Sequence, residues 1–171
     1  MKYIVSVWAI IAATICAATP ANAYSVSLDK VTCPMETIGD EAAGALGRDL
    51  SSTKSAPSDA QLEMLTAATN ACAAKHGWSK EDSKSALDFN AAVLSAIGLE
   101  DRLRAAGVEA TEFESVLDDQ MQGDLQAIVD GAPNNPIIDK AIEMLTVQQG
   151  DKINEEMAGN LGAYLVQVAR T

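Results

Sequence analysis

The sequence has 171 residues, and its 24 aspartates and glutamates outnumber its 12 lysines and arginines, which gives a formal net charge of −12. This charge argues against nucleic acid and anionic lipid as partners, because both would repel the chain. Only 4% of the residues are aromatic and no stretch shows sustained alternation of β-branched residues, so the sequence predicts a compact, single-domain all-α bundle of about six to seven helices with one disulfide.

The chain begins with the pattern of a secretory signal peptide. Lys2 supplies a positive charge, and residues 4–18 form an uncharged, mostly apolar run that is shorter than the roughly 18 residues a membrane span requires. Pro20 ends this run, and residues 21–23 match an A-x-A cleavage signal, so we expect cleavage after Ala23. The alternative, a lipid anchor at Cys16, lacks the small residue that normally precedes such a cysteine.

Cleavage would leave a mature chain of residues 24–171, whose length suits a single all-α domain. We expect this product to be periplasmic or secreted, without a stable membrane span. An irregular arm is predicted over residues 24–32, followed by helices separated by glycine, proline and capping signals. The predicted helices cover residues 33–50, 58–76, 79–98, 100–106, 111–129, 135–149 and 153–168.

Short polar and glycine signals set these predicted boundaries. Gly77 and Gly98 are predicted to end their helices. Glycines spaced three apart, at 44 and 47 and at 159 and 162, are predicted to let helices approach one another closely. Capping boxes are predicted at three helix starts, formed by Ser58 with Gln61, Ser79 with Asp82, and Thr111 with Glu114.

Export would remove Cys16 and leave Cys33 and Cys72, which predicts one disulfide in an oxidising compartment. If residues 33–50 and 58–76 form an antiparallel helical hairpin, its two legs run about 26 and 21 Å from the intervening loop to their cysteines. The two cysteines then lie at nearly the same height and can bond. The alternative, a free redox pair, lacks a C-x-x-C motif.

Cys72 and the single histidine, His76, are four residues apart, which places them on one face of a helix. A zinc site needs three or four ligands, commonly cysteine or histidine. With Cys72 bonded, His76 has no co-ligand of its kind, and the chain has no H-E-x-x-H motif. We therefore predict no metal and no cofactor, and interpret His76 as a favourable last-turn residue at a helix C-terminus.

Trp78 falls at the second position beyond the predicted helix end at Gly77. Residues at that position commonly pack against side chains of the last turn, so we expect Trp78 to cover the disulfide near Cys72 and Ala73. The alternative is an exposed tryptophan that anchors a binding partner.

The sequence offers little that indicates catalysis. It contains no G-x-S-x-G elbow, no phosphate-binding loop and no dinucleotide-binding motif. We predict a non-catalytic, exported binding or accessory protein whose partner is an unidentified protein. The first alternative is a carrier of a small apolar ligand in a bundle cavity lined by residues such as Met121, Leu125 and Ile142. A hydrolase that uses paired carboxylates is the second alternative.

Overall fold

The structure is a computed structural model that describes residues 26–52, 57–118, 120–131 and 135–171. These residues form eight α-helices and two 3-10 helices, with no strand among them, so the predicted all-α fold is confirmed. The predicted signal peptide, its cleavage after Ala23 and the first two residues of the predicted arm lie outside the described residues.

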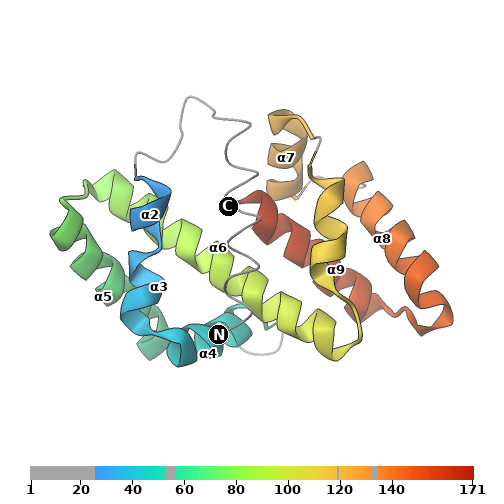
Figure 1. The fold of residues 1–171 in the computed structure, drawn as a ribbon, viewed down its shortest axis with the longest axis horizontal. Helices are drawn as coiled ribbons and strands as arrows, with labels where there is room; N and C mark the ends of the chain where they lie inside the picture. Colours follow the sequence, from blue (N-terminus) through green and yellow to red (C-terminus); the bar gives the residue numbers. More distant parts are fainter. Residues whose placement is uncertain (1–25, 53–56, 119, 132–134) are drawn as a thin grey trace.

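The helices follow one another through short connections, as Figure 1 shows. In chain order they are α2 (Leu28–Val31), α3 (Cys33–Ile38), α4 (Asp40–Leu50), α5 (Asp59–His76), α6 (Lys80–Ala105), the 3-10 helix η1 (Ala110–Val116), α7 (Gln122–Val129), α8 (Pro136–Gln149), the 3-10 helix η2 (Gly150–Lys152) and α9 (Glu155–Ala169).

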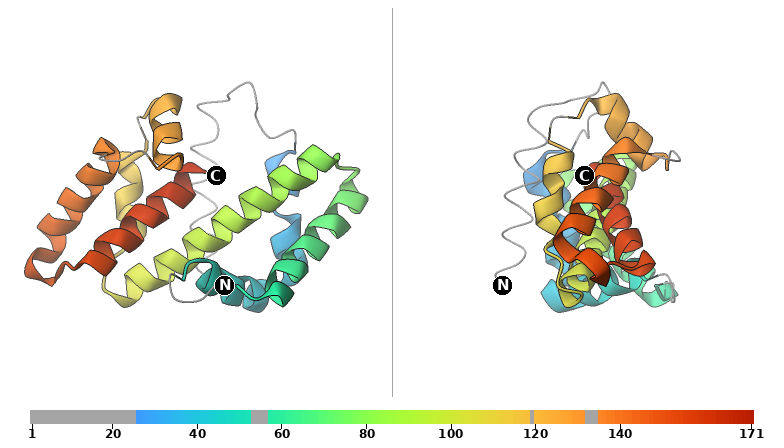
Figure 2. Two further views of the ribbon diagram at one scale, coloured as in Figure 1. Left: turned by 180° about the vertical axis from the view of Figure 1, so that it is seen from behind. Right: turned by 90° about the vertical axis from the view of Figure 1, so that its right-hand side faces the viewer.

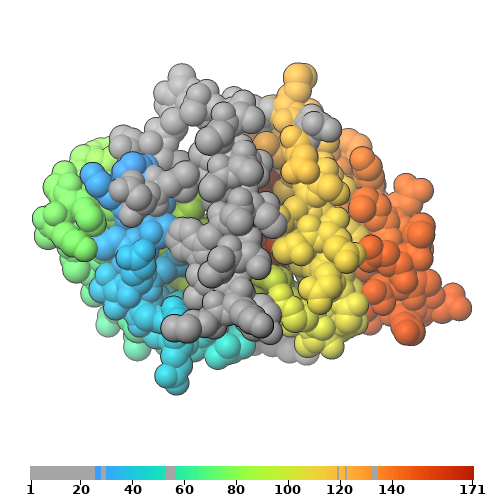
Figure 3. Space-filling view, viewed as in Figure 1, coloured from blue at the N-terminus to red at the C-terminus, as the bar shows by residue number. Residues whose placement is uncertain are grey.

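The long helix α6 crosses the molecule, and the other helices gather on its two sides (Figures 1 and 2). Helices α2 to α5 lie on one side, and η1, α7, α8 and α9 lie on the other. On the face drawn in Figure 3, α2 and α3 form one flank and η1 and α8 form the other. Because α6 packs against both α4 and α9, it connects the two groups of helices.

The buried apolar side chains form three clusters, and α6 contributes to each of them. Two clusters lie among the N-terminal helices, one centred on Val31 and Phe89 and the other on Leu46 and Leu94. The third is the largest, and we call it the C-terminal core. It consists of Ala96, Leu99, Leu103, Val108, Ala110, Phe113, Val116, Leu117, Ile128, Ile137, Ala141, Leu145, Met157, Leu161, Tyr164 and Leu165.

The predicted helix end at Gly98 is wrong, because α6 continues through it to Ala105. Gly98 is buried where α4 crosses α6, opposite Gly47. A Cβ atom built on Gly98 would lie 2.1 Å from the carbonyl oxygen of Gly47, and one on Gly47 would lie 2.5 Å from the carbonyl oxygen of Leu94. Gly98 therefore permits close helix packing, as predicted for Gly47, and does not stop a helix.

Two other predicted helices are divided in the structure. The predicted helix over residues 33–50 is split at Gly39, whose φ of +79° favours glycine and redirects the chain between α3 and α4. The predicted helix over residues 111–129 is replaced by η1 and α7, which are separate elements. The arm over residues 24–32, predicted to be irregular, contains α2.

Candidate functional site

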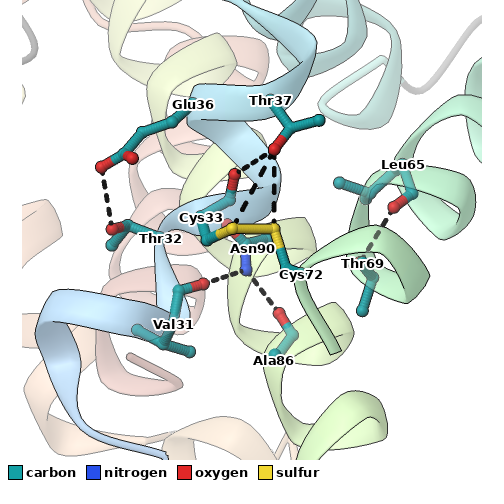
Figure 4. Close-up of a disulfide and its surroundings, with 10 residues drawn as sticks. All are labelled: Val31, Thr32, Cys33, Glu36, Thr37, Leu65, Thr69, Cys72, Ala86 and Asn90. Atoms are coloured by element: carbon teal, nitrogen blue, oxygen red, sulfur yellow. Dashed lines mark hydrogen bonds between the residues drawn. A yellow bond between two sulfur atoms is a disulfide. The ribbon is translucent and has the colours of Figure 1, made fainter. Parts of the chain in front are cut away.

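The predicted disulfide joins Cys33, at the start of α3, to Cys72 in α5, with Cα atoms 6.0 Å apart (Figure 4). Both cysteines are buried. The Thr37 hydroxyl donates to the Cys33 carbonyl at 2.8 Å and lies 3.5 Å from the Cys72 sulfur. The bond therefore fixes α3 against α5, as the helical-hairpin argument predicted, although Gly39 bends the first leg of that hairpin.

Asn90 lies close to this bond and is a buried polar residue within the predicted helix over residues 79–98. Its Nδ2 donates to the Val31 carbonyl at 2.7 Å and to the Ala86 carbonyl at 2.6 Å. Asn90 thereby ties the end of α2 to α6, which explains why α2 is ordered against the bundle. An asparagine within a run of core-facing residues was the sequence signal for this role.

Trp78 and His76 form the turn between α5 and α6. Gly77 adopts a left-handed conformation with a φ of +69°, and the Trp78 amide donates to the Ala73 carbonyl at 3.0 Å, as predicted for this helix end. The Trp78 and His76 rings stack with centroids 5.7 Å apart. Trp78 is half-buried and packs against the apolar cluster that contains Val31. That Trp78 covers the disulfide stays a prediction, and so does its alternative role as a binding anchor.

Two buried glutamates lie in the C-terminal half of the molecule, and we call them and their side-chain partners the acid cluster: Glu100 and Arg104 of α6, Glu114 of η1 and Tyr164 of α9. Both glutamates and the tyrosine are less than a tenth exposed. The Tyr164 hydroxyl donates to Glu114 Oε1, and the Arg104 guanidinium pairs with Glu100. Glu114 Oε2 is buried and accepts no hydrogen bond from the described residues.

The predicted capping box of Thr111 with Glu114 is wrong. η1 begins without a side-chain cap, and Glu114 instead turns inward to meet Tyr164. The sequence predicts only that Tyr164 lies within a helix over residues 153–168 and that Glu100 begins a helix over residues 100–106. The pairing links residues 50 positions apart, so no local pattern revealed it.

Burial controls the proton affinities in this cluster. It raises the pKa of Glu114 above its ordinary value; the Tyr164 hydrogen bond opposes this rise, and the charges of Glu100 and Asp118 add to it. Burial also raises the pKa of Glu100, against the attraction of Arg104. Burial and the charge of Glu114 raise the pKa of Tyr164, so its hydroxyl stays protonated and available to donate.

In this arrangement both carboxyl groups are bonded to neighbouring side chains and are not presented together to a substrate. A glycoside hydrolase places both carboxyl groups against the bond that it cleaves. Here the Glu114 carboxyl is enclosed and already bonded to Tyr164, and Glu100 is paired with Arg104. The side chain of Arg104 is 30% exposed. Besides Glu100, its guanidinium also lies 3.3 Å from the exposed carboxylate of Asp101 and 3.8 Å from that of Glu109.

Three large apolar side chains are exposed among the described residues, and each belongs to a different segment: Leu62 in α5 (42%), Met121 before α7 (76%) and Val147 in α8 (82%). Isolated exposed apolar residues are normal on soluble proteins. The expectation that Met121 lines an enclosed cavity is wrong, because its side chain points mainly into solvent. Leu125 and Ile142 are half-buried.

Within the described ranges, no group of three or more histidine, cysteine, aspartate or glutamate side chains is arranged to hold a metal ion. None of the helices in the same ranges combines the length and the apolar character needed to cross a bilayer. Comparisons with protein-family models, with curated proteins and with solved structures gave no match.

Proposed function

We propose that the chain is exported and acts in the periplasm or outside the cell as a non-catalytic binding or accessory protein. The observation that carries this proposal is the buried disulfide between Cys33 and Cys72. Structural disulfides persist in oxidising compartments and are rare in the reducing cytosol. The signal-peptide pattern that ends at Ala23 supports the same destination.

The acid cluster supports the non-catalytic part of the proposal. A general acid or nucleophile must reach the reacting atom of its substrate within hydrogen-bonding distance. Glu100 and Glu114 are bonded to other residues of the protein and are less than a tenth exposed, so a substrate has no direct access to them. Their arrangement is that of an internal polar contact between helices.

The charge of the chain indicates the kind of partner. With a formal net charge of −12, the protein attracts basic surfaces and is repelled by nucleic acid and anionic lipid. Among the described residues, the exposed large apolar side chains are scattered and do not form a hydrophobic docking face. A protein with a basic surface is therefore the partner that we propose, and their association should weaken as salt screens the charges.

Intact-mass measurement of the protein purified from its native cells tests export. The expected species begins at Tyr24 and is two hydrogens lighter than its fully reduced form. Replacing Ala23 with arginine is the matched change, because it should block cleavage and leave the full-length mass. Recovery of the uncleaved chain from the cell interior, with all three of its cysteines as free thiols, would refute the proposal.

Salt-dependent binding tests the partner. Native protein should co-elute with a basic protein after extraction at low salt, and the complex should dissociate between about 0.05 and 0.5 M sodium chloride as the Debye length shortens. Polylysine and a polyanion serve as paired probes for the purified chain, and only the first should bind. Equal affinity for both probes, or binding that strengthens with salt, would contradict the proposed electrostatic recognition.

A further inference from the structure

The acid cluster brings groups from three elements of the C-terminal half around the buried carboxyl group of Glu114. Glu114 belongs to η1, its hydrogen-bond donor Tyr164 belongs to α9, and Glu100 and Arg104 approach from α6. Phe113 and Val116, which flank Glu114 in η1, are buried in the C-terminal core. The state of Glu114 therefore affects how η1 sits against α9 and α6.

Only one oxygen of Glu114 has a hydrogen-bonding partner. Tyr164 donates to Oε1, whereas Oε2 is buried without a donor among the described residues. An ionised carboxylate would place negative charge on a buried oxygen that no donor among the described residues stabilises, which is costly in an apolar interior. A protonated carboxyl group has no charge to stabilise and still accepts the Tyr164 hydrogen bond.

The charged groups around Glu114 act in the same direction. Glu100 of α6 and Asp118, in the turn after η1, both repel a negative charge on Glu114. The neighbouring cation, Arg104, is already paired with Glu100 and lies 3.3 Å from Asp101 and 3.8 Å from Glu109. From α9, Tyr164 supplies the neutral hydroxyl donor.

The element that carries Glu114 is suited to movement. η1 is a 3-10 helix of 7 residues without a side-chain cap. Because 3-10 hydrogen bonds have poorer geometry than α-helical ones, runs longer than three or four residues are uncommon, so the backbone bonds of η1 hold it only weakly. The segment therefore depends on its packing against α8, α9 and α6 for its position.

We propose that Glu114 is a proton-sensing group, protonated when η1 is closed against α9, and that its ionisation releases η1 and loosens the C-terminal core. A carboxyl group that holds its proton more tightly in the closed form favours that form at low pH. The closed form is then fully favoured below the ordinary glutamate pKa of about 4.3, and this preference is lost as the pH rises through the folded-state pKa.

Within that window opening releases one proton, so each pH unit multiplies the opening equilibrium constant by up to about ten. Amide hydrogen exchange of the purified chain between pH 5 and 8, corrected for intrinsic exchange rates, measures this constant. The expected result is that protection of η1 and α9 amides falls as the pH rises. Protection of the α4 and α5 amides, on the other side of α6, should not fall in this way as the pH rises.

Glu114→Gln keeps the shape of the protonated side chain and cannot ionise, so its η1 and α9 protection should be independent of pH. Glu143→Gln, at an exposed position of α8, is the control and should behave as the unmodified chain does. The same pH dependence in Glu114→Gln as in the unmodified chain would overturn the proposal.

A direct titration covers the case in which Glu114→Gln does not fold. The 13C signal of the Glu114 carboxyl group in the unmodified chain should titrate well above the ordinary glutamate midpoint of about 4.3. A midpoint at or below that value would show that the folded chain does not hold this proton and would overturn the proposal.

Discussion

Replacing Gly98 with alanine tests the contact that holds α4 against α6. The new Cβ atom would lie 2.1 Å from the Gly47 carbonyl oxygen and 2.5 Å from the Gly47 carbonyl carbon, where ordinary contact begins at about 3.4 Å. Both obstructing atoms are backbone, so rotation of a side chain cannot relieve the overlap. The helices must separate by more than about 1 Å, which disturbs the fully buried pair Leu46 and Leu94.

Overpacking of a well-filled core costs typically 1–3 kcal/mol, and a backbone overlap of this size belongs at the upper end, about 3 kcal/mol. Alanine returns up to about 1 kcal/mol through its better helix propensity. We therefore expect Gly98→Ala to lower the free energy of unfolding by about 2 kcal/mol. For a chain of this size, that corresponds to a fall in Tm of roughly 4–8 °C.

Urea unfolding followed by circular dichroism measures the change, with Gly159→Ala as the matched control. A Cβ atom on Gly159, in α9, would meet no atom within 4 Å, so this variant gains helix propensity without overlap. It should be more stable than the unmodified chain by about 0.5–1 kcal/mol. If Gly98→Ala is stabilised to the same extent, Gly98 does not form the close contact described here.

Three further changes test the contacts described above. Replacing both disulfide cysteines with serine should lower the free energy of unfolding by about 4 kcal/mol, given the sequence separation of 39, and a reductant should then leave the urea midpoint of the variant unchanged. Asn90→Ala should lower the free energy of unfolding by about 2 kcal/mol, because the buried Val31 carbonyl loses its hydrogen-bond donor. Asn70→Ala, at an exposed position, is the control and should change it little. Tyr164→Phe removes the hydroxyl donor to Glu114 and should lower the free energy of unfolding by about 1–3 kcal/mol at pH 7, with a smaller loss as the pH falls and Glu114 takes up a proton. A loss for Tyr164→Phe that grows on acidification would contradict the assignment of the proton to Glu114.

Local signals in the sequence predicted the helix boundaries that depend on neighbouring residues. The capping boxes of Ser58 with Gln61 and of Ser79 with Asp82 form as predicted, since each connects residues three positions apart. Gly77 ends α5 in a left-handed conformation for the same local reason. The disulfide was also predictable, because only two cysteines follow the signal-peptide pattern.

The features that could not be predicted from the sequence depend on contacts between segments that are far apart along the chain. Gly98 resembles a helix stop, but its role depends on α4 crossing at Gly47, about 50 residues earlier. The continuing spacing of Leu94, Gly98 and Leu103 on core-facing positions was a weak sign that α6 did not end there. Glu114 similarly matched a capping box, although its partner is in the last helix.

The disulfide also limits how far the chain can be drawn out. An extended chain spans at most about 3.3–3.6 Å per residue. Because the disulfide joins two cysteines 39 positions apart, roughly 130 Å of chain between them cannot be extended when the ends of the oxidised protein are pulled. All of this hidden length belongs to the segment from α3 to α5. A force that unravels the oxidised protein from its ends therefore extends the C-terminal helices completely but leaves a closed ring of residues on the N-terminal side.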